Sequence, residues 1–104
     1  MRNERDVKEA VKKLFKKYGV WYYMIVPLAY SRTGVPDFIC CYEGGFFAVE
    51  TKFGYNKPKP RQVLEMDAIR DSGGICMVIN EKNIGELETF LERVSKHGYD
   101  EESK

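Results

Sequence analysis

Apolar residues recur at intervals of three and four along two stretches of the chain, which predicts two amphipathic helices. The first covers residues 4–18 and ends at Gly19, and the second covers about 84–96. A third helix is expected at about 61–71, because Pro60 suits the first turn of a helix.

Strand-like runs separate these helices. Residues 20–29 are rich in aromatic and β-branched side chains, and Pro27 ends that strand. Residues 36–52 have the pattern of a hairpin that turns near 43–45. Residues 75–79 are apolar without alternation, as expected for a strand buried on both faces. The predicted order of elements is therefore α-β-β-β-α-β-α.

The composition fits one small soluble domain. The chain has 104 residues, of which 43% are hydrophobic and 32% charged. No apolar run approaches the roughly 20 residues that span a bilayer, and the opening residues lack the apolar core of a signal peptide. We expect a single domain at 1–98, an acidic tail at 99–104, no membrane contact and a cytoplasmic location.

Cysteine and histidine usage excludes several kinds of site. Cys40, Cys41 and Cys76 are odd in number, lack CxxC spacing and lie in apolar runs, so we expect reduced core residues. His97 is the single histidine and lies near the C-terminal end, where solvation is expected. Histidine-based nuclease motifs and most zinc sites are thereby excluded.

Charge is distributed unevenly along the chain. Residues 1–61 contain twelve Lys and Arg against six Asp and Glu, a net charge of +6. Residues 62–104 contain five against ten, a net charge of −5. A basic half suggests a surface that faces a polyanion. Taken alone, a solvated helix face explains the four lysines of the first helix better.

The predicted hairpin contains three charged residues that a small core rarely accommodates without a function. Asp37 begins it, and Glu50 and Lys52 lie near its end. Two carboxylates could hold Mg²⁺, which prefers oxygen ligands, and the main-chain carbonyl of Thr51 could add a third oxygen. Lys52 shares a strand face with Glu50 and could stabilise charge on a phosphoryl group.

The register of the hairpin decides whether the carboxylates can meet. Asp37 faces Glu50 only if the residue numbers of opposed partners sum to 87, which needs a loop of 43–44 or 42–45. A loop of 43–45 puts the two on opposite faces unless a bulge intervenes. The alternatives also remain open that Asp37 only marks a turn and that Glu50 belongs to the polar face of an edge strand.

Helix phase selects two further candidates. Glu4 lies three residues before Val7 and seven before Val11, in line with the apolar stripe, whereas Glu9 lies among the lysines. Glu4 can therefore point toward the sheet. Gln62 shares a helix face with apolar residues and could also face inward.

These motifs resemble the PD-(D/E)xK nuclease superfamily, through Pro36-Asp37 and Glu50-Thr51-Lys52. The likeness is greater to the small stand-alone members of the VRR-NUC family, which occur in bacteriophages and bacteria. It extends from the leading glutamate, Glu4, to the last core strand. The resemblance implies an α/β (α+β) restriction-endonuclease-like domain, with an αβββαβ core, a mixed sheet and an extra C-terminal helix. Thr51 departs from the family, where an apolar residue is usual.

By this resemblance, Asp37, Glu50 and the Thr51 carbonyl bind Mg²⁺ or Mn²⁺, and Glu4 binds the metal through water or completes the site. Lys52 assists catalysis, and Gln62 positions Lys52 or the substrate. We expect the loop bases to contact DNA; these are Arg32, Lys57, Lys59 and Arg61.

The expected function is a metal-dependent endodeoxyribonuclease acting on branched DNA, similar to Holliday junction resolvases that act as homodimers. If the chain is phage-encoded, its location is the cytoplasm of the bacterial host. A flap or nicking nuclease is the alternative within the same class. Outside it, the alternatives are a non-catalytic DNA-binding module on the same fold and a small α/β interaction domain.

Overall fold

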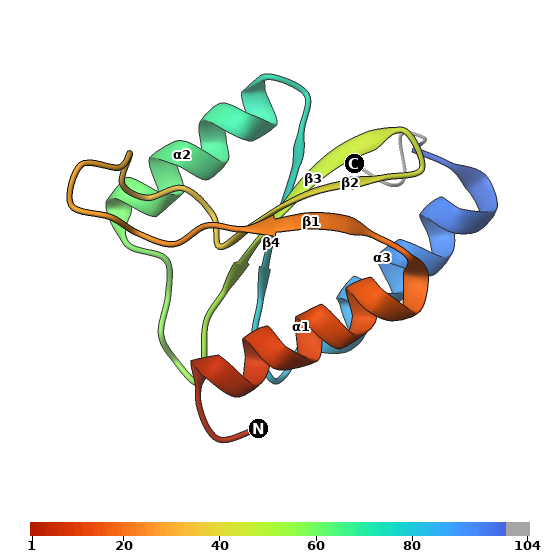
Figure 1. The fold of residues 1–104 in the computed structure, drawn as a ribbon, viewed down its shortest axis with the longest axis horizontal. Coiled ribbons are helices and arrows are strands. Elements are labelled where there is room, and N and C mark those ends of the chain that lie inside the picture. The colour runs from red at the N-terminus through yellow and green to blue at the C-terminus, as the bar shows by residue number, and fades with distance from the viewer. Residues whose placement is uncertain (100–104) are drawn as a thin grey trace.

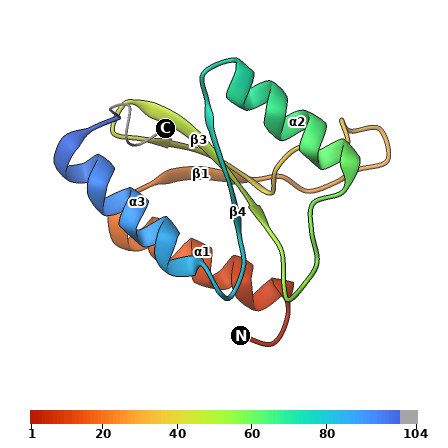
Figure 2. The same cartoon turned by 180° about the vertical axis from the view of Figure 1, so that it is seen from behind.

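Helices cover both faces of a four-stranded sheet, with α1 and α3 side by side on one face and α2 on the other (Figures 1 and 2). The structure is a computed structural model, and it describes residues 1–99. The predicted order of elements is confirmed. The elements are α1 (Glu4–Tyr18), β1 (Trp21–Met24), β2 (Phe38–Tyr42), β3 (Gly45–Thr51), α2 (Pro60–Asp71), β4 (Ile75–Ile79) and α3 (Ile84–His97). Among these residues, no helix combines the length and apolar character needed to span a bilayer.

The sheet is mixed, as expected. Its strand order is β1-β2-β3-β4; β1–β2 and β2–β3 are antiparallel pairs, whereas β3–β4 is parallel. A parallel pair needs a long crossover, and α2 supplies it. The strand β4 packs between α2 and α3 but forms one edge of the sheet, so of its residues only Cys76 and Ile79 are buried. The prediction of burial on both faces therefore holds only in part.

The main core lies between the sheet and the α1–α3 layer. The apolar stripe of α1 is fully buried at Val7, Val11 and Phe15, and α3 adds Leu87 and Leu91. Burial of a large apolar side chain contributes about 1.5–3 kcal/mol, so this layer supplies most of the stability of a domain of this size. A smaller cluster of Ala48, Met66 and Cys76 fixes α2 to the opposite face.

The β2–β3 hairpin has the even register that the site requires. Tyr42 pairs with Gly45, which leaves a two-residue loop of Glu43 and Gly44. Both loop residues have positive φ, 48° and 80°, as in the type I′ turn whose twist matches that of the flanking strands. Opposed residue numbers sum to 87 throughout the hairpin, so Asp37 lies opposite Glu50.

Two expectations are corrected by the structure. The first strand is shorter than residues 20–29, because regular pairing ends at Met24; only the Ile25 N–H continues it, donating to the Asp37 carbonyl at 2.7 Å. Cys41 is exposed and not a core residue, since it alternates with Cys40, whose side chain belongs to the main core. All three thiols are free.

The acidic tail lies mostly outside the described residues. Its first residue, Tyr99, is described and packs its ring against Phe90, with the hydroxyl donating to the Tyr42 carbonyl at 2.7 Å.

Gly34 allows the segment before Asp37 to pack closely against the start of α2. Its φ of +81° favours glycine, and a Cβ there would lie 2.7 Å from the Arg61 carbonyl oxygen. The loop can therefore approach α2 closely only without a side chain. This contact fixes the distance between the β2 end of the hairpin and the first turn of α2.

Gly34→Ala should lower the free energy of unfolding by about 2–3 kcal/mol, because it combines left-handed backbone strain with a clash against main-chain atoms. Gly19→Ala is the matched control. Gly19 has a similar φ of +71° but open space around its Cβ position, so the loss should be about 1 kcal/mol. Urea denaturation measures both values, and equal losses would contradict the close approach.

Candidate active site

Two carboxylates lie together where β2 begins and β3 ends. The Asp37 backbone N–H donates to Glu50 Oε1 at 3.2 Å, which ties the two residues across the hairpin. The Glu50 side chain is 2% exposed, whereas that of Asp37 is 21% exposed. The pair therefore presents one deeply buried carboxylate and one that reaches solvent.

Thr51 holds the carboxylate of Asp37. Its backbone N–H and its hydroxyl both donate to Asp37 Oδ2, at 2.8 and 2.5 Å. The Thr51 side chain is completely buried. The sequence pointed only to the main-chain carbonyl of this residue, because an isolated hydroxyl on a strand carries no signal of its partner.

Gln62 and Lys52 bind the carboxylate of Glu50. Gln62 Nε2 donates to Glu50 Oε2 at 2.7 Å, and Lys52 Nζ lies 3.2 Å from the same oxygen. Gln62 is oriented by its own helix, since its Oε1 accepts from the Lys59 N–H at 2.8 Å. The inward orientation of Gln62 is confirmed, and the side chain it contacts is Glu50.

The electrostatics of Glu50 favour a bound cation. Burial and the nearby charge of Asp37 raise the pKa of Glu50, and Lys52 only partly offsets them. A divalent ion would stabilise both charged carboxylates, and hard oxygen donors suit Mg²⁺ or Mn²⁺. Within residues 1–99, no group of three His, Cys, Asp or Glu side chains converges. An ion here would therefore complete its shell with main-chain oxygen and water, as Mg²⁺ commonly does.

Glu4 lies at the margin of this pair. Its carboxylate is 3.3 Å from Lys8 Nζ, and Lys8 Nζ is in turn 4.0 Å from Asp37 Oδ1. Glu9 instead pairs with Lys12 and is exposed, so the predicted helix phase is correct. Lys8 is a site neighbour that the sequence analysis missed, although its spacing of four from Glu4 indicated it.

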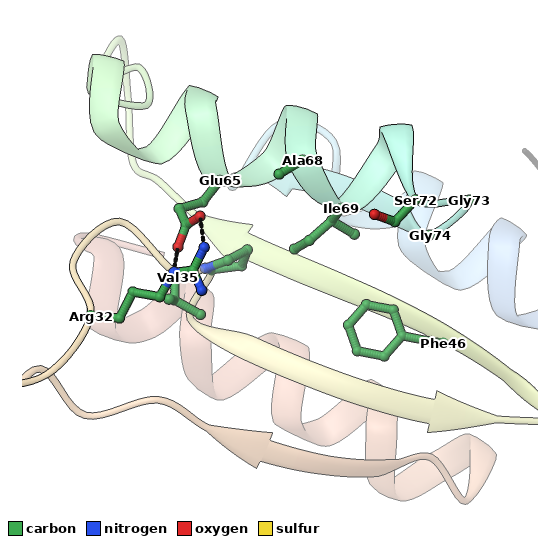
Figure 3. A pocket seen from close by; sticks show the side chains of 10 residues that line it. Arg32, Val35, Phe46, Glu65, Ala68, Ile69, Ser72, Gly73 and Gly74 are labelled. Atoms are coloured by element: carbon green, nitrogen blue, oxygen red, sulfur yellow. Dashed lines mark hydrogen bonds and ion pairs between the residues drawn. The ribbon is translucent and has the colours of Figure 1, made fainter.

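The predicted DNA-binding residues fall into two groups. Lys57, Lys59 and Arg61 are exposed between β3 and the first turn of α2. Arg32 forms a bidentate pair with Glu65, its Nε and Nη2 donating at 2.5 and 2.8 Å (Figure 3). This pair lowers the pKa of the largely buried Glu65 carboxyl, and the Arg32 side chain remains 69% exposed.

A hollow of about 620 Å³ lies beside α2. Figure 3 shows the side chains that line it. Its lining includes Phe46 of β3 and Ile69 of α2, and the Arg32–Glu65 pair borders it. Neither Asp37 nor Glu50 lines it, so the candidate site is a polar cluster outside this hollow.

No protein-family model matches the sequence, and no curated protein matches it. The fold is similar to that of a solved structure described as a VRR_NUC domain, with a TM-score of 0.66 and 23% sequence identity. The similarity covers 92% of this chain and 97% of that one. The chain therefore has the fold of a VRR_NUC domain, which confirms the predicted fold class.

Asp37→Asn and Glu50→Gln should change the stability of the metal-free protein in opposite directions. Asp37→Asn removes repulsion from Glu50 and keeps an oxygen for the Thr51 donors, so the melting temperature at neutral pH should be higher. Glu50→Gln leaves the buried Lys52 ammonium without its carboxylate, so it should cost about 3 kcal/mol. Urea and thermal unfolding in chelator measure both, and a common sign would contradict this electrostatic account.

The pH dependence of the Asp37→Asn effect provides a further check. Glu50 has a raised pKa, so it keeps its proton to a higher pH in the folded state than in the unfolded state. Its contribution to stability therefore falls as the pH rises from 4.5 through the raised pKa of the folded state, and Asp37→Asn removes part of that loss. The advantage of Asp37→Asn over wild type should therefore grow from pH 4 to pH 7. An advantage that is independent of pH would have another origin.

Proposed function

We propose that this chain is a divalent-metal-dependent DNA endonuclease that hydrolyses phosphodiester bonds. The observation that carries the proposal is the cluster of Asp37, Glu50 and Lys52 at one end of the hairpin, with Gln62 bound to it. The fold of a VRR_NUC domain supports the same reading. A small interaction domain would have no need to bury a carboxylate and a lysine together.

The residues that would hold the ion are Asp37, Glu50 and the main-chain carbonyl of Thr51, with Glu4 acting through water. Mg²⁺ and Mn²⁺ are the ions that such oxygen donors suit. When bound, such an ion supplies Lewis-acid charge to the phosphodiester and lowers the pKa of water.

Lys52 and Gln62 have separate roles in this proposal. Lys52 is buried with its ammonium at the Glu50 carboxylate, so it stabilises negative charge that develops on the phosphoryl group. Gln62 holds Glu50 in place from the first turn of α2. Both side chains start out ordered, which lowers the cost of organising the transition state.

DNA would be bound through phosphate contacts from the loops. Lys57, Lys59 and Arg61 are exposed on the segment that leads from Lys52 into α2, and they can bind the backbone beside the site. Arg32 has one side of its guanidinium engaged by Glu65, and the exposed remainder would contact phosphate.

We further propose branched DNA as the substrate and a homodimer as the active species, by resemblance to Holliday junction resolvases. The working location is then the cytoplasm, that of a bacterial host if the chain is phage-encoded. Resolving a junction requires two strand cuts, and a two-fold dimer brings two sites to a symmetric substrate. A domain this small has little surface for reading a sequence.

The uncovered half of the sheet supports a dimer. Trp21 pairs with Cys41 and Cys41 with Phe46, so these residues share a face with Tyr23. Trp21, Tyr23 and Phe46 are 60%, 58% and 46% exposed, because α2 covers only the β3–β4 half. This aromatic face continues into the hollow beside α2 through Phe46. Exposed apolar surface of this kind is typical of an interface.

Asp37→Asn and Lys52→Met test the chemistry. Asp37→Asn should abolish Mg²⁺-dependent cleavage by removing a negative ligand. Lys52→Met should reduce turnover by roughly a hundredfold or more while DNA affinity changes little, since one lysine is a small part of a phosphate-binding surface. Single-turnover cleavage and DNA titration in Ca²⁺ or chelator separate the two effects. Near wild-type turnover in either variant would remove that residue from the site.

A cleavage panel with four-way junction, flap, single-stranded and linear duplex DNA, with and without Mg²⁺ or Mn²⁺, tests the substrate. We expect metal-dependent cleavage with a preference for the junction. Preference for flaps would favour the flap nuclease, and binding without cleavage would favour the non-catalytic module.

Light scattering tests the assembly in the same preparation. Trp21→Glu should give a monomer, because it adds charge to the aromatic face, whereas Leu64→Glu on the exposed side of α2 should not. A wild-type monomer that cuts linear duplex as well as junctions would refute the dimer and the resolvase together.

A further inference from the structure

We propose that the Thr51 hydroxyl is a positioning group for the metal ligand Asp37. It holds Oδ2 of the carboxylate inside the protein, so that Oδ1 is the oxygen presented to the ion. The inference rests on the proposed function, because the ion in question is the one bound at that site.

The geometry concentrates two donors on one oxygen. Asp37 Oδ2 accepts both the backbone N–H and the hydroxyl of Thr51, at 2.8 and 2.5 Å. Oδ1 accepts no hydrogen bond among the described residues, and Lys8 Nζ lies 4.0 Å from it. One oxygen is therefore engaged by protein donors, and the other is left without one in a side chain that is 21% exposed.

The donors themselves are rigid. Thr51 is completely buried and pairs with Ile79 of the neighbouring strand β4. The Lys52 N–H donates to the Ile79 carbonyl, so the pairing of the two strands continues past Thr51. A β-branched side chain also has few rotamers on a strand. The hydroxyl thus cannot follow a moving carboxylate, and Asp37 must adopt the orientation that Thr51 sets.

A positioned ligand binds metal more tightly than a free one. Groups that hydrogen-bond to metal ligands typically contribute 10- to 100-fold in metal affinity, because they remove the rotational freedom that binding would otherwise have to freeze. An apolar residue at this position would keep the backbone N–H donor and lose only the hydroxyl. The side chain of Thr51 therefore adds a second restraint beyond the one that any residue here provides.

A purely structural role makes a different prediction. A buried hydroxyl needs some hydrogen-bond partner, and Asp37 would then be only the nearest acceptor. Loss of the hydroxyl would in that case alter the stability of the fold and leave metal affinity unchanged. Metal affinity of the folded, DNA-free protein is the measurement that separates the two roles.

The experiment compares Mn²⁺ binding to the DNA-free protein by calorimetry or electron paramagnetic resonance. Thr51→Val should weaken Mn²⁺ binding by about tenfold or more, and Thr51→Ser should remain close to wild type because it keeps the hydroxyl. Thr89→Val is the matched control, since the exposed Thr89 hydroxyl only donates to the Gly85 carbonyl of its own helix. Wild-type Mn²⁺ affinity in Thr51→Val would overturn the inference.

Two further comparisons make every outcome decisive. If Thr51→Val does not fold, the pair Thr51→Ser and Thr51→Ala replaces it, because these differ only in the hydroxyl; equal Mn²⁺ affinity in that pair overturns the inference. If wild type binds no Mn²⁺, or if Asp37→Asn binds it equally well, the proposed function and this inference both fail. If Mn²⁺ binding depends on Asp37 but not on the Thr51 hydroxyl, this inference fails and the proposed function stands.

Discussion

The register of the β2–β3 hairpin is the constraint on which the site depends. The turn at Glu43 and Gly44 has two residues with positive φ, and it aligns Phe38 with Val49 and therefore Asp37 with Glu50. Because strand side chains alternate between faces, a slip of one residue would send one carboxylate into the apolar core and separate the pair. The same register also directs Phe38 and Phe47 toward α1. The geometry of the turn therefore determines both the packing of the core and the position of the two carboxylates.

Hydrogen-bond donors and one ammonium group contact the two carboxylates that this register brings together. Glu50 is buried and receives Gln62 and Lys52, whereas Asp37 receives both donors of Thr51. These contacts come from two places in the fold: Thr51 and Lys52 at the end of β3, and Gln62 in the first turn of α2. Burial and repulsion still raise the pKa of Glu50, so these donors do not fully compensate the buried charge. A site that remains short of positive charge is suited to attract a cation.

The two faces of the sheet are covered to different extents. One is closed by α1 and α3 around a continuous apolar core, and the other is covered by α2 over β3 and β4 only (Figures 1 and 2). This asymmetry leaves the aromatic face around Trp21 and Tyr23 open while the carboxylates lie at the end of the hairpin. Assembly and chemistry would thus use different parts of the same sheet.

Local patterns in the sequence determined much of this protein. The 3,4 spacing of α1 and α3, the Pro60 start of α2 and the pattern of the hairpin predicted these elements within a few residues, because such signals act over short stretches of chain. The first strand was predicted too long. They also selected Asp37, Glu50 and Lys52 from their spacing. Contacts between distant elements were decided only by the tertiary structure: the partner of the Thr51 hydroxyl, the pairing of Arg32 with Glu65, the approach of Lys8 to Asp37 and the exposure of Cys41. A side chain's partner depends on how separate elements pack, and no local pattern records that packing.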